Sequence, residues 1–382
     1  MQTPDVIAYF ADDPARVYQL LQWLPVLERL DASHPTAIVT RNEETAAIVR
    51  EHTRLRVFDA PGFNDLAELY AEIDPKVAVY CNNSMFNFNS LLQGRMLHVH
   101  INHGESDKQS MVSNNAKAYD RVFVAGEAAV QRHRAALMEL DESRLVRIGR
   151  PQLDLRPEPV IPASERRTVL YAPTWEGDAE YNDYTSVDLF GPEIVRSLLA
   201  VPDTRVVYKP HPRVATSETP AIRDNHLAIL ELLLDGARRD PSAGHEAVLS
   251  GDILAVFPRC DAMVTDVSSV GLDWLYLQTD KPIIITDRHH DADRLRLEVP
   301  VSRCADVIDS DNLDGLTALV TDRLEHDAHH LARVAMRHHY FDDNAVGDST
   351  RRFIETVGEL VVRRDALLGD LGLLGGTESV IA

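Results

Sequence analysis

The feature that most constrains the fold is an alternation of short apolar runs with segments of helical periodicity, which recurs along most of the chain. The apolar run Val6–Phe10 precedes a helical pattern over Pro14–Leu30, with Asp12 or Asp13 as its cap, and the apolar run Ala37–Thr40 follows. Strands that alternate with helices form a parallel, doubly wound sheet. The sequence therefore predicts an α/β fold.

The same two patterns give the remaining elements. The predicted strands are Val6–Phe10, Ala37–Thr40, Leu55–Phe58, Val77–Tyr80, Met96–Ile101, Val122–Val124, Leu145–Ile148, Thr168–Tyr171, Arg205–Tyr208, Ala262–Val264, Ile283–Ile285 and Asp306–Ile308. The predicted helices after the first are Glu43–His52, Asn64–Ile73, Ala128–Leu140, Pro192–Leu199, Pro220–Leu234, Val270–Leu277, Leu313–Leu324, His326–His339 and Ser349–Leu368.

A proline-rich, polar segment, Arg150–Pro159, interrupts the alternation and is typical of a linker. It predicts an N-terminal Rossmann-like domain over residues 1–155 and a C-terminal one over residues 156–348. Residues 349–368 are predicted as a helix that can cross back to the first domain, and residues 369–382 as a flexible tail. Two such domains would face each other across a cleft, with ligands beyond the C-terminal ends of the strands.

The composition restricts both the partners and the cellular location of the protein. A formal net charge of −21 lacks the basic surface that sequence-independent nucleic-acid binding needs. Cys81, Cys260 and Cys304 show no metal spacing and no even pairing, which indicates a reducing cytoplasm. No window reaches ~18 uninterrupted apolar residues, and the first residues do not have the pattern of a signal peptide. We expect a cytoplasmic protein with no membrane span.

Polar residues follow four of the predicted strands, where an α/β protein binds its ligands. The four segments are Asn102–Lys108, Ala172–Glu176, Lys209–Arg213 and Thr265–Ser269. One segment belongs to the first half of the chain and three belong to the second, so we expect them to meet across the cleft.

Ser268 and Ser269 fall where the helix Val270–Leu277 begins. A helix N-terminus offers unpaired backbone N–H groups and a partial positive charge, which suit an anion such as phosphate. Plain capping by the hydroxyls is the simpler interpretation, because serine is a preferred N-cap residue. Both interpretations stay open from these residues alone.

Lys209, His211 and Arg213 place three cationic or donor side chains after a strand, with a proline behind each of the first two. Such a loop suits a phosphate or pyrophosphate. The alternative is an exposed turn that happens to be basic. Thr174 is either an N-cap residue or a further hydrogen-bond donor to the phosphate.

His103 precedes a glycine at a strand end, and a neutral imidazole is the usual general base for a hydroxyl. The alternative is a loop histidine that binds backbone. A metal site with His98 and His100 is less favoured, since those two share one strand face, His103 lies beyond it, and no carboxylate pattern completes the site. We predict no metal.

Other histidines form adjacent pairs, His289-His290, His329-His330 and His338-His339. Adjacent side chains on a helix point apart, so the pairs indicate a solvated surface rather than a metal site. The patterns GxxxxGK[ST] and GxGxxG are absent, which argues against a Walker site and a dinucleotide site.

Several short motifs occur in a fixed order. They are HG at His103-Gly104, GxPxxD at Gly149–Asp154, YAPTW at Tyr171–Trp175, KPHP at Lys209–Pro212 and TDVSSVGLDWLYLQTDKPI at Thr265–Ile283, with Asp342-Asp343 and Gly347–Arg352 near the end. Over roughly residues 95–352 this series resembles the CDP-glycerol glycerophosphotransferase family, the teichoic-acid primases and polymerases with a GT-B fold. The His-Pro and Ser-Ser pairs also resemble motifs of bacterial sialyltransferases that bind CMP-sialic acid. Both resemblances point to a cytidine nucleotide.

The acceptor side departs from the family pattern. Asn102 stands where the family has a tryptophan, and Glu105–Lys108 stands where it has a TPLK-like run, of which only Lys108 matches. The segment Asp342–Gly347 is also longer than the family's aspartate–glycine pair. The resemblance makes Gly104, Glu105 and Lys108 the candidates for the acceptor side.

The resemblance implies transfer of a polyol phosphate, glycerol phosphate first among the candidates, from a CDP-linked donor to a hydroxyl acceptor in cell-wall or capsule polymer synthesis, with release of CMP. His103 would take the proton of the acceptor, and His211 would bind the pyrophosphate. The donor phosphates and nucleotide would be held by Thr174, Lys209, Arg213, Asp266, Ser268, Ser269, Thr350 and Arg352. No cofactor and no metal are implied.

The same resemblance implies an acceptor that is lipid-linked or an oligosaccharide. A lipid-linked acceptor would bring the protein to the inner face of the membrane as a peripheral protein. One alternative is a GT-B glycosyltransferase that uses a CMP- or UDP-activated sugar. Another is a non-catalytic nucleotide-binding protein, which would bind CMP or CDP without turnover.

Overall fold

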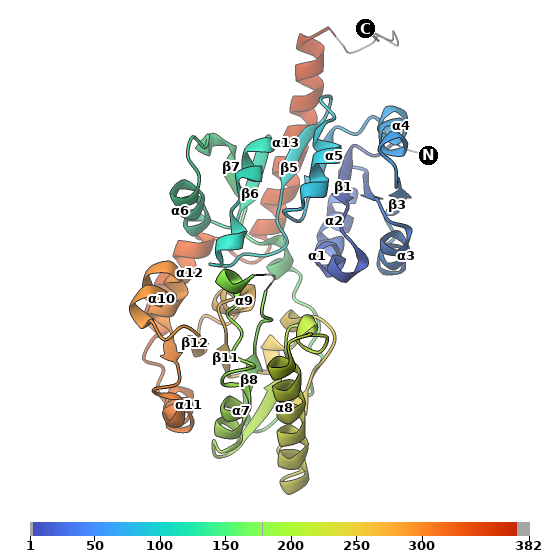
Figure 1. Cartoon of the computed structure of the whole chain (residues 1–382). Helices are drawn as coiled ribbons and strands as arrows, with labels where there is room; N and C mark the ends of the chain where they lie inside the picture. Colours follow the sequence, from blue (N-terminus) through green and yellow to red (C-terminus); the bar gives the residue numbers. More distant parts are fainter. Residues whose placement is uncertain (1–2, 178, 373–382) are drawn as a thin grey trace. The chain divides into compact units, whose positions relative to one another are not determined.

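The computed structural model describes residues 3–177 and 179–372 and divides into two compact units (Figure 1). The N-terminal unit comprises the described residues of Met1–Gly104, Val112–Leu155 and Phe341–Ala382. The C-terminal unit comprises those of Glu105–Met111 and Arg156–Tyr340. The chain therefore passes between the units at four places, after Gly104, Met111, Leu155 and Tyr340.

A seven-stranded sheet forms the centre of the N-terminal unit, with neighbours paired in parallel in the order β3-β2-β1-β4-β5-β6-β7. Its strands are β1 (Val6–Phe10), β2 (Thr36–Thr40), β3 (Arg56–Asp59), β4 (Val77–Tyr80), β5 (Leu97–His100), β6 (Arg121–Val124) and β7 (Leu145–Arg147). Its helices are α1 (Tyr18–Leu21), α2 (Leu24–Asp31), α3 (Glu43–His52), α4 (Phe63–Ile73), α5 (Phe88–Leu91), α6 (Glu127–Ala136) and α13 (Asp348–Asp370).

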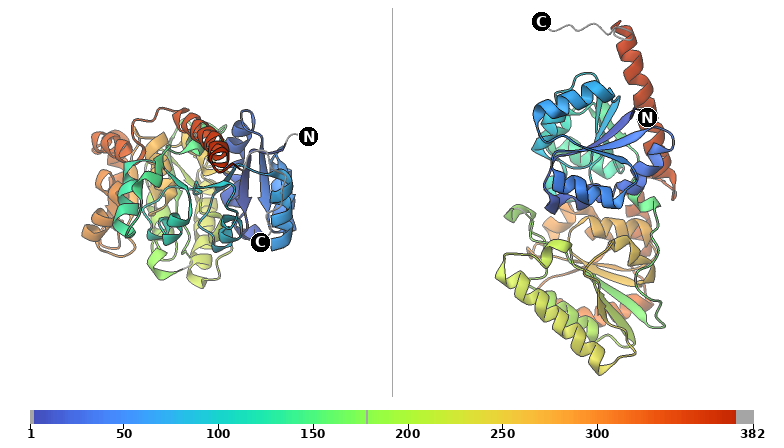
Figure 2. Two further views of the ribbon diagram at one scale, coloured as in Figure 1. Left: turned by 90° about the horizontal axis from the view of Figure 1, so that it is seen from above. Right: turned by 90° about the vertical axis from the view of Figure 1, so that its right-hand side faces the viewer.

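The last helix completes the core of the N-terminal unit. Buried Phe353 and Val357 of α13 join one hydrophobic cluster with the central strands, and the ring of Phe353 lies 5.3 Å from that of Trp23. Figure 2 shows α13 running along this unit. The helix is predicted over Ser349–Leu368 and extends slightly beyond both ends; residues 373–382 of the predicted tail lie outside the described residues.

A six-stranded sheet forms the centre of the C-terminal unit, in the order β10-β9-β8-β11-β12-β13 and again parallel. Its strands are β8 (Arg167–Ala172), β9 (Thr204–Tyr208), β10 (Glu246–Ala247), β11 (Ala262–Thr265), β12 (Ile283–Thr286) and β13 (Asp306–Ile308). Its helices are α7 (Gly191–Leu199), α8 (Pro220–Arg239), α9 (Ser269–Leu277), α10 (Ala292–Glu298), α11 (Leu316–Glu325) and α12 (His330–Phe341), the last of which ends one residue into the other unit.

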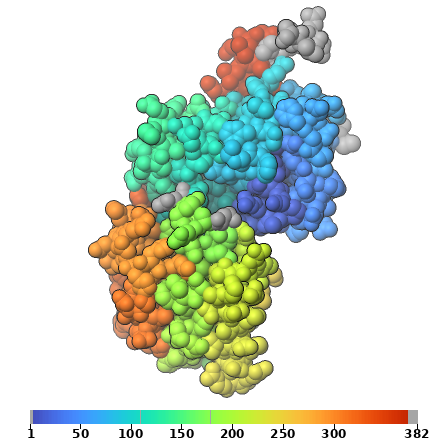
Figure 3. Space-filling model, in the orientation of Figure 1, coloured from blue at the N-terminus to red at the C-terminus, as the bar shows by residue number. Residues whose placement is uncertain are grey.

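Helix α8 packs one face on the C-terminal sheet and exposes the other face to solvent. Ile222, Ile229 and Leu233 of α8 are buried against the sheet, whereas Leu227 and Leu234 are exposed. The helix accordingly forms part of the surface, in yellow-green in Figure 3. The predicted α/β class with two doubly wound sheets is confirmed. The continuous apolar runs form strands that are buried on both faces, as is typical of parallel sheets.

The segment Pro14–Leu30 is helical for most of its length, as predicted, but it is not one continuous helix. The segment breaks into a 3₁₀ turn at Pro14–Arg16, α1 and α2. Pro25 lies in the first turn of α2, and a proline there has no N–H to continue a preceding helix. Neither predicted cap acts as one: Asp13 makes no side-chain capping bond, and Asp12 instead accepts hydrogen bonds from Asn82 and Ser84.

Two further observations concern the setting of the protein. No helix within the described residues is long and apolar enough to cross a membrane. The three cysteines, all of them described, are buried and make no disulfide.

Candidate functional site

Three loops at one edge of the C-terminal sheet carry most of the predicted donor residues. They follow β9, β8 and β11, which are direct neighbours in the sheet. Backbone hydrogen bonds connect the first two loops, since the N–H of His211 donates to the carbonyl of Pro173 over 3.0 Å. Parallel strands end at the same edge, so Thr174, Lys209 and Ser268 are brought together by the topology itself.

Asp266 holds the loop after β8 in place. One carboxylate oxygen accepts the backbone N–H groups of Thr174 at 2.7 Å and Ser186 at 3.2 Å, and the other accepts the hydroxyl of Thr286 at 2.7 Å. Burial raises the pKa of Asp266 to about 6, against the effect of these hydrogen bonds. Both oxygens are thus engaged within the unit, and the geometry suits positioning of Thr174 better than contact with a phosphate.

The N-terminus of α9 provides the clearest anion-binding geometry. Ser268 is the N-cap residue in extended conformation, with φ −161° and ψ 174°, yet it makes no side-chain capping hydrogen bond. Its Oγ is buried and has no partner among the described residues. Ser269 is the first residue of the helix. The hydroxyl of Ser268 and the first backbone N–H groups are therefore oriented for a ligand, and side-chain capping by Ser268 is not observed.

The loop after β9 combines a histidine, an arginine and an aromatic ring. Nδ1 of His211 accepts the backbone N–H of Arg213 at 3.2 Å, so the neutral ring carries its proton on Nε2. The His211 ring stacks on Trp175 with centroids 5.9 Å apart, and the Arg213 guanidinium lies 3.8 Å from the centroid of the same indole. Trp175 thus fixes both side chains. Burial lowers the pKa of Lys209, which is only 4 % exposed.

Lys108 belongs to the same cluster, although the sequence places it on the acceptor side. The segment Glu105–Met111 groups with the C-terminal unit, and Nζ of Lys108 lies 3.5 Å from Oγ1 of Thr174. Burial lowers the pKa of Lys108 to about 8, while Asp266 and Asp183 act in the opposite direction. Glu105 is buried in this segment as well. A buried cation beside Thr174 is suited to neutralise a phosphate.

His103 and Gly104 lie in the N-terminal unit, shortly after strand β5. Asn102 adopts a left-handed conformation at φ 51°, its side chain accepts the N–H of His103 at 2.8 Å, and its carbonyl accepts the indole N–H of Trp23 at 2.6 Å. Loss of solvation, and then the positive charge of Arg150, lower the pKa of His103 to about 4. The imidazole is therefore neutral near pH 7, as a general base requires.

Thr350 and Arg352 belong to the N-terminal unit, whereas Thr174, Lys209 and Ser268 belong to the C-terminal unit. The two carboxylate oxygens of Asp154 accept the N–H groups of Gly347 and Thr350, each at 2.7 Å, and the Thr350 hydroxyl donates to the carbonyl of Pro151 at 3.3 Å. The GxPxxD motif therefore anchors the start of α13, and Thr350 is part of that anchor.

The other histidines do not form a metal site. His98 pairs through Nδ1 with the hydroxyl of Tyr80 and through Nε2 with the carbonyl of Gln93. Burial lowers the pKa of His100 to about 3. Within residues 3–177 and 179–372, no group of three or more His, Cys, Asp or Glu side chains could hold a metal ion.

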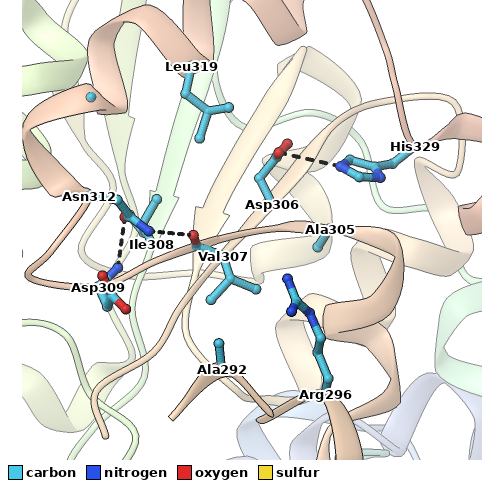
Figure 4. Close-up of a pocket in the computed structure, with 11 residues that line it drawn as sticks. Ala292, Arg296, Ala305, Asp306, Val307, Ile308, Asp309, Asn312, Leu319 and His329 are labelled. Atoms are coloured by element: carbon cyan, nitrogen blue, oxygen red, sulfur yellow. Dashed lines mark hydrogen bonds and ion pairs between the residues drawn. The ribbon is translucent and has the colours of Figure 1, made fainter. Parts of the chain in front are cut away.

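A pocket of about 490 Å³ beside β13 contains none of the predicted site residues. Figure 4 shows its lining, with Asp306 turned toward His329. The Asp306 carboxylate accepts two hydrogen bonds from Arg323, at 2.7 and 3.0 Å, and lies 3.4 Å from Nε2 of His329. Because this carboxylate is already paired, the pocket offers less chemistry than the three loops.

Trp175, Glu176 and Arg150 are the residues that reasoning from the sequence left without a role. Trp175 ends the YAPTW motif, Glu176 directly follows it, and Arg150 lies inside the GxPxxD motif, so their positions in or beside the motifs are the signal that could have found them.

The two parallel sheets define a protein with a GT-B-like fold, and the solved structures that share this fold include three of different kinds. They are the wall teichoic acid polymerase TagF (14% identity, TM-score 0.56, 95% of this chain and 90% of that one), UDP-GlcNAc 2-epimerase from Methanocaldococcus jannaschii (12%, 0.60, 93% and 99%) and a glycosyltransferase from Rickettsia africae ESF-5 (12%, 0.57, 94% and 99%). No match was found among curated proteins.

A model of the family described as CDP-Glycerol:Poly(glycerophosphate) glycerophosphotransferase matches residues 95–294, more than half of the chain. The protein belongs to this family and is a glycerophosphotransferase-family enzyme. The resemblance stated from the motifs is thereby confirmed.

Proposed function

We propose that this enzyme transfers glycerol phosphate from CDP-glycerol to a hydroxyl of a poly(glycerophosphate) acceptor in teichoic-acid synthesis. The family match carries the proposal, since residues 95–294 contain both His103 and His211. The same range contains Lys108 and the loops after β8, β9 and β11. These loops supply the hydroxyls, backbone N–H groups and cations that a diphosphate needs.

In the proposed reaction, the acceptor oxygen attacks the phosphorus that bears the glycerol. The bond from that phosphorus to the bridging oxygen of the diphosphate breaks, and CMP leaves with the electron pair. Phosphoryl transfer depends on positioning and on stabilisation of charge rather than on a covalent enzyme intermediate. The N-terminus of α9 with Ser268 and the buried cation of Lys108 are suited to that stabilisation.

The two histidines take different parts. His103, neutral at pH 7, accepts the proton of the attacking hydroxyl. His211 donates through Nε2–H to an oxygen of the diphosphate, the direction set by the hydrogen bond that its Nδ1 accepts. Asp266 acts through Thr174, whose loop it holds, and Arg213 acts with Trp175 in fixing His211. Thr350 and Arg352 stay candidates for binding the donor phosphates.

The family name specifies a poly(glycerophosphate), and we propose that this acceptor is linked to a lipid or to an oligosaccharide. A lipid-linked acceptor requires the protein to work as a peripheral protein at the inner face of the membrane. Co-sedimentation with vesicles that carry a lipid-linked primer, compared with vesicles that lack it, distinguishes the two kinds of acceptor.

The test is release of CMP from CDP-glycerol in the presence of a poly(glycerophosphate) primer. We expect His211→Ala and His103→Ala to lower kcat by about 10²–10³-fold, as loss of one preorganised group does at comparable sites. His52→Ala and His326→Ala replace exposed histidines, one in each unit, and should keep wild-type rates. Turnover with a CMP- or UDP-sugar but not with CDP-glycerol would identify a glycosyltransferase instead.

A further inference from the structure

Glu176 occupies a distinctive place in the donor cluster. It follows Thr174 by two positions in the loop after β8. The intervening Trp175 stacks with the His211 ring, and the Arg213 guanidinium lies over its indole. Its carboxylate contacts Ser217, which stands four positions after Arg213 of the His211 loop.

The carboxylate of Glu176 is held in one orientation. Oε1 accepts a hydrogen bond of 2.5 Å from the hydroxyl of Ser217. The same hydroxyl oxygen accepts the N–H of Thr219 at 3.1 Å, so the single proton of Ser217 is committed to Glu176. Oε2 is buried and has no hydrogen-bond partner in the part of the chain that the structure describes.

A buried acceptor without a donor carries a desolvation penalty, and such groups in proteins call for a partner. Asp266, in the neighbouring loop, provides the contrast, because both of its oxygens are satisfied by the unit itself. The open oxygen of Glu176 thus indicates that a bound molecule supplies the missing donor.

The chemistry of a carboxylate restricts what that donor is. An ionised carboxylate only accepts hydrogen bonds, and it repels the charged oxygens of a diphosphate. The groups of a CDP-linked polyol that remain are neutral N–H and O–H donors, namely the exocyclic amine of cytosine, the ribose hydroxyls and the polyol hydroxyls. A glutamate that accepts from the cytosine amine is an established pairing in base recognition.

We propose that Glu176 is a specificity-determining residue that accepts a hydrogen bond from a neutral N–H or O–H group of the CDP-linked donor. The proposal rests on the proposed function, because it takes the donor to be CDP-glycerol. Ser217 is the positioning residue that aims the carboxylate.

The test compares Glu176→Gln with the wild type by calorimetric binding of CMP, CDP and CDP-glycerol. The amide keeps the size of the side chain but places an N–H or a weaker acceptor where the carboxylate oxygen was. We expect affinity for CDP-glycerol to fall about tenfold or more, in line with hydrogen bonds to charged groups. Glu165→Gln, an exposed glutamate of the same unit, should bind as the wild type does.

The three ligands locate the donor group. An equal loss of affinity for CMP and CDP-glycerol assigns the contact to the nucleoside. Binding of UMP is then measured as well, and a smaller ratio of CMP affinity to UMP affinity in the variant than in the wild type assigns the contact to the cytosine amine. A loss confined to CDP-glycerol assigns it to the glycerol. Affinities for all three within about twofold of the wild type, in a variant with native circular dichroism, overturn the proposal.

Two controls keep the outcome decisive. If Glu176→Gln does not fold, Ser217→Ala removes only the aiming hydrogen bond, and an unchanged affinity for all three ligands again overturns the proposal. If the wild type neither binds CDP-glycerol nor releases CMP from it, the proposed function fails, which differs from a wild type that binds and a variant that binds equally well.

Discussion

One carboxylate oxygen of Asp266 accepts the backbone N–H of Thr174 at 2.7 Å, although the two residues are 92 positions apart. The bond joins the ends of β11 and β8, which are neighbours in the sheet. It keeps the Thr174 loop beside Lys108 and the His211 loop. Asp266, which the motif suggests as a ligand-binding residue, therefore holds the neighbouring loop in place.

Asp266→Asn should change how stability depends on pH. A carboxyl whose folded pKa is about 6 contributes stability that is complete below the unfolded pKa of 3.8 and is lost as pH rises through about 6. The wild type should therefore exceed the variant in unfolding free energy by about 1.4 kcal/mol more at about pH 5 than at about pH 7.5. Urea unfolding at both pH values measures this, and a difference independent of pH contradicts it.

Lys108 should make donor binding fail in alkali. Its pKa of about 8 means that the ammonium loses its charge as pH rises past that value, and with it the attraction to phosphate. The KM for CDP-glycerol should rise roughly tenfold between about pH 7 and about pH 9.5. Lys108→Arg should abolish most of the rise, since arginine stays charged, whereas Lys117→Met should leave it intact. A KM that is constant in the wild type rules out this role.

His103 should titrate far below an ordinary histidine. With a pKa of about 4, the acidic limb of kcat/KM should lie near that pH rather than near 6.5. Arg150→Met removes the nearby positive charge that disfavours the imidazolium, so the limb should move upward in pH. Arg29→Met, an exposed arginine of the same unit, should not move it. The profile would count against the assignment if Arg150→Met left the limb in place.

Gly149→Ala should destabilise the N-terminal unit. Gly149 has φ +81°, and an added Cβ would lie 2.1 Å from Oγ of Ser349. The left-handed backbone and the contact together should reduce the unfolding free energy by at least about 1–3 kcal/mol. Gly94→Ala is the matched control, because an added Cβ there meets no atom within 4 Å. Equal midpoints of urea unfolding in the two variants would refute the expectation.

The strands were predictable because the physics that buries them is local. Ile283–Thr286 is a continuous apolar run, and such a run in an alternating pattern belongs to a parallel sheet. β10 escaped prediction because it has only two residues, and α10 because a short exposed helix carries little apolar periodicity. Pro25 could have signalled the break between α1 and α2, since proline begins helices far more readily than it continues them.

The sequence predicts which loops form the candidate site, but it does not predict which residues of these loops contact one another. That polar residues follow β8, β9 and β11 is visible in the sequence, whereas the adjacency of these strands depends on sheet order. Lys108 shows the limit most clearly: a short segment gives no local sign of the unit it joins, because contacts with Thr174 and Tyr184 decide that. Ser268 resembles a capping residue, and only the backbone geometry shows that its hydroxyl does not cap.

The position of α13 has a consequence for synthesis on the ribosome. The N-terminal unit needs Phe353 and Val357 for its hydrophobic cluster, and these residues emerge only after the whole of the C-terminal unit has been translated. Domains of most multidomain chains fold in order from the N-terminus as they emerge. Here the hydrophobic cluster of the first unit is completed only by the last helix, so the C-terminal unit can fold while the N-terminal unit is still incomplete.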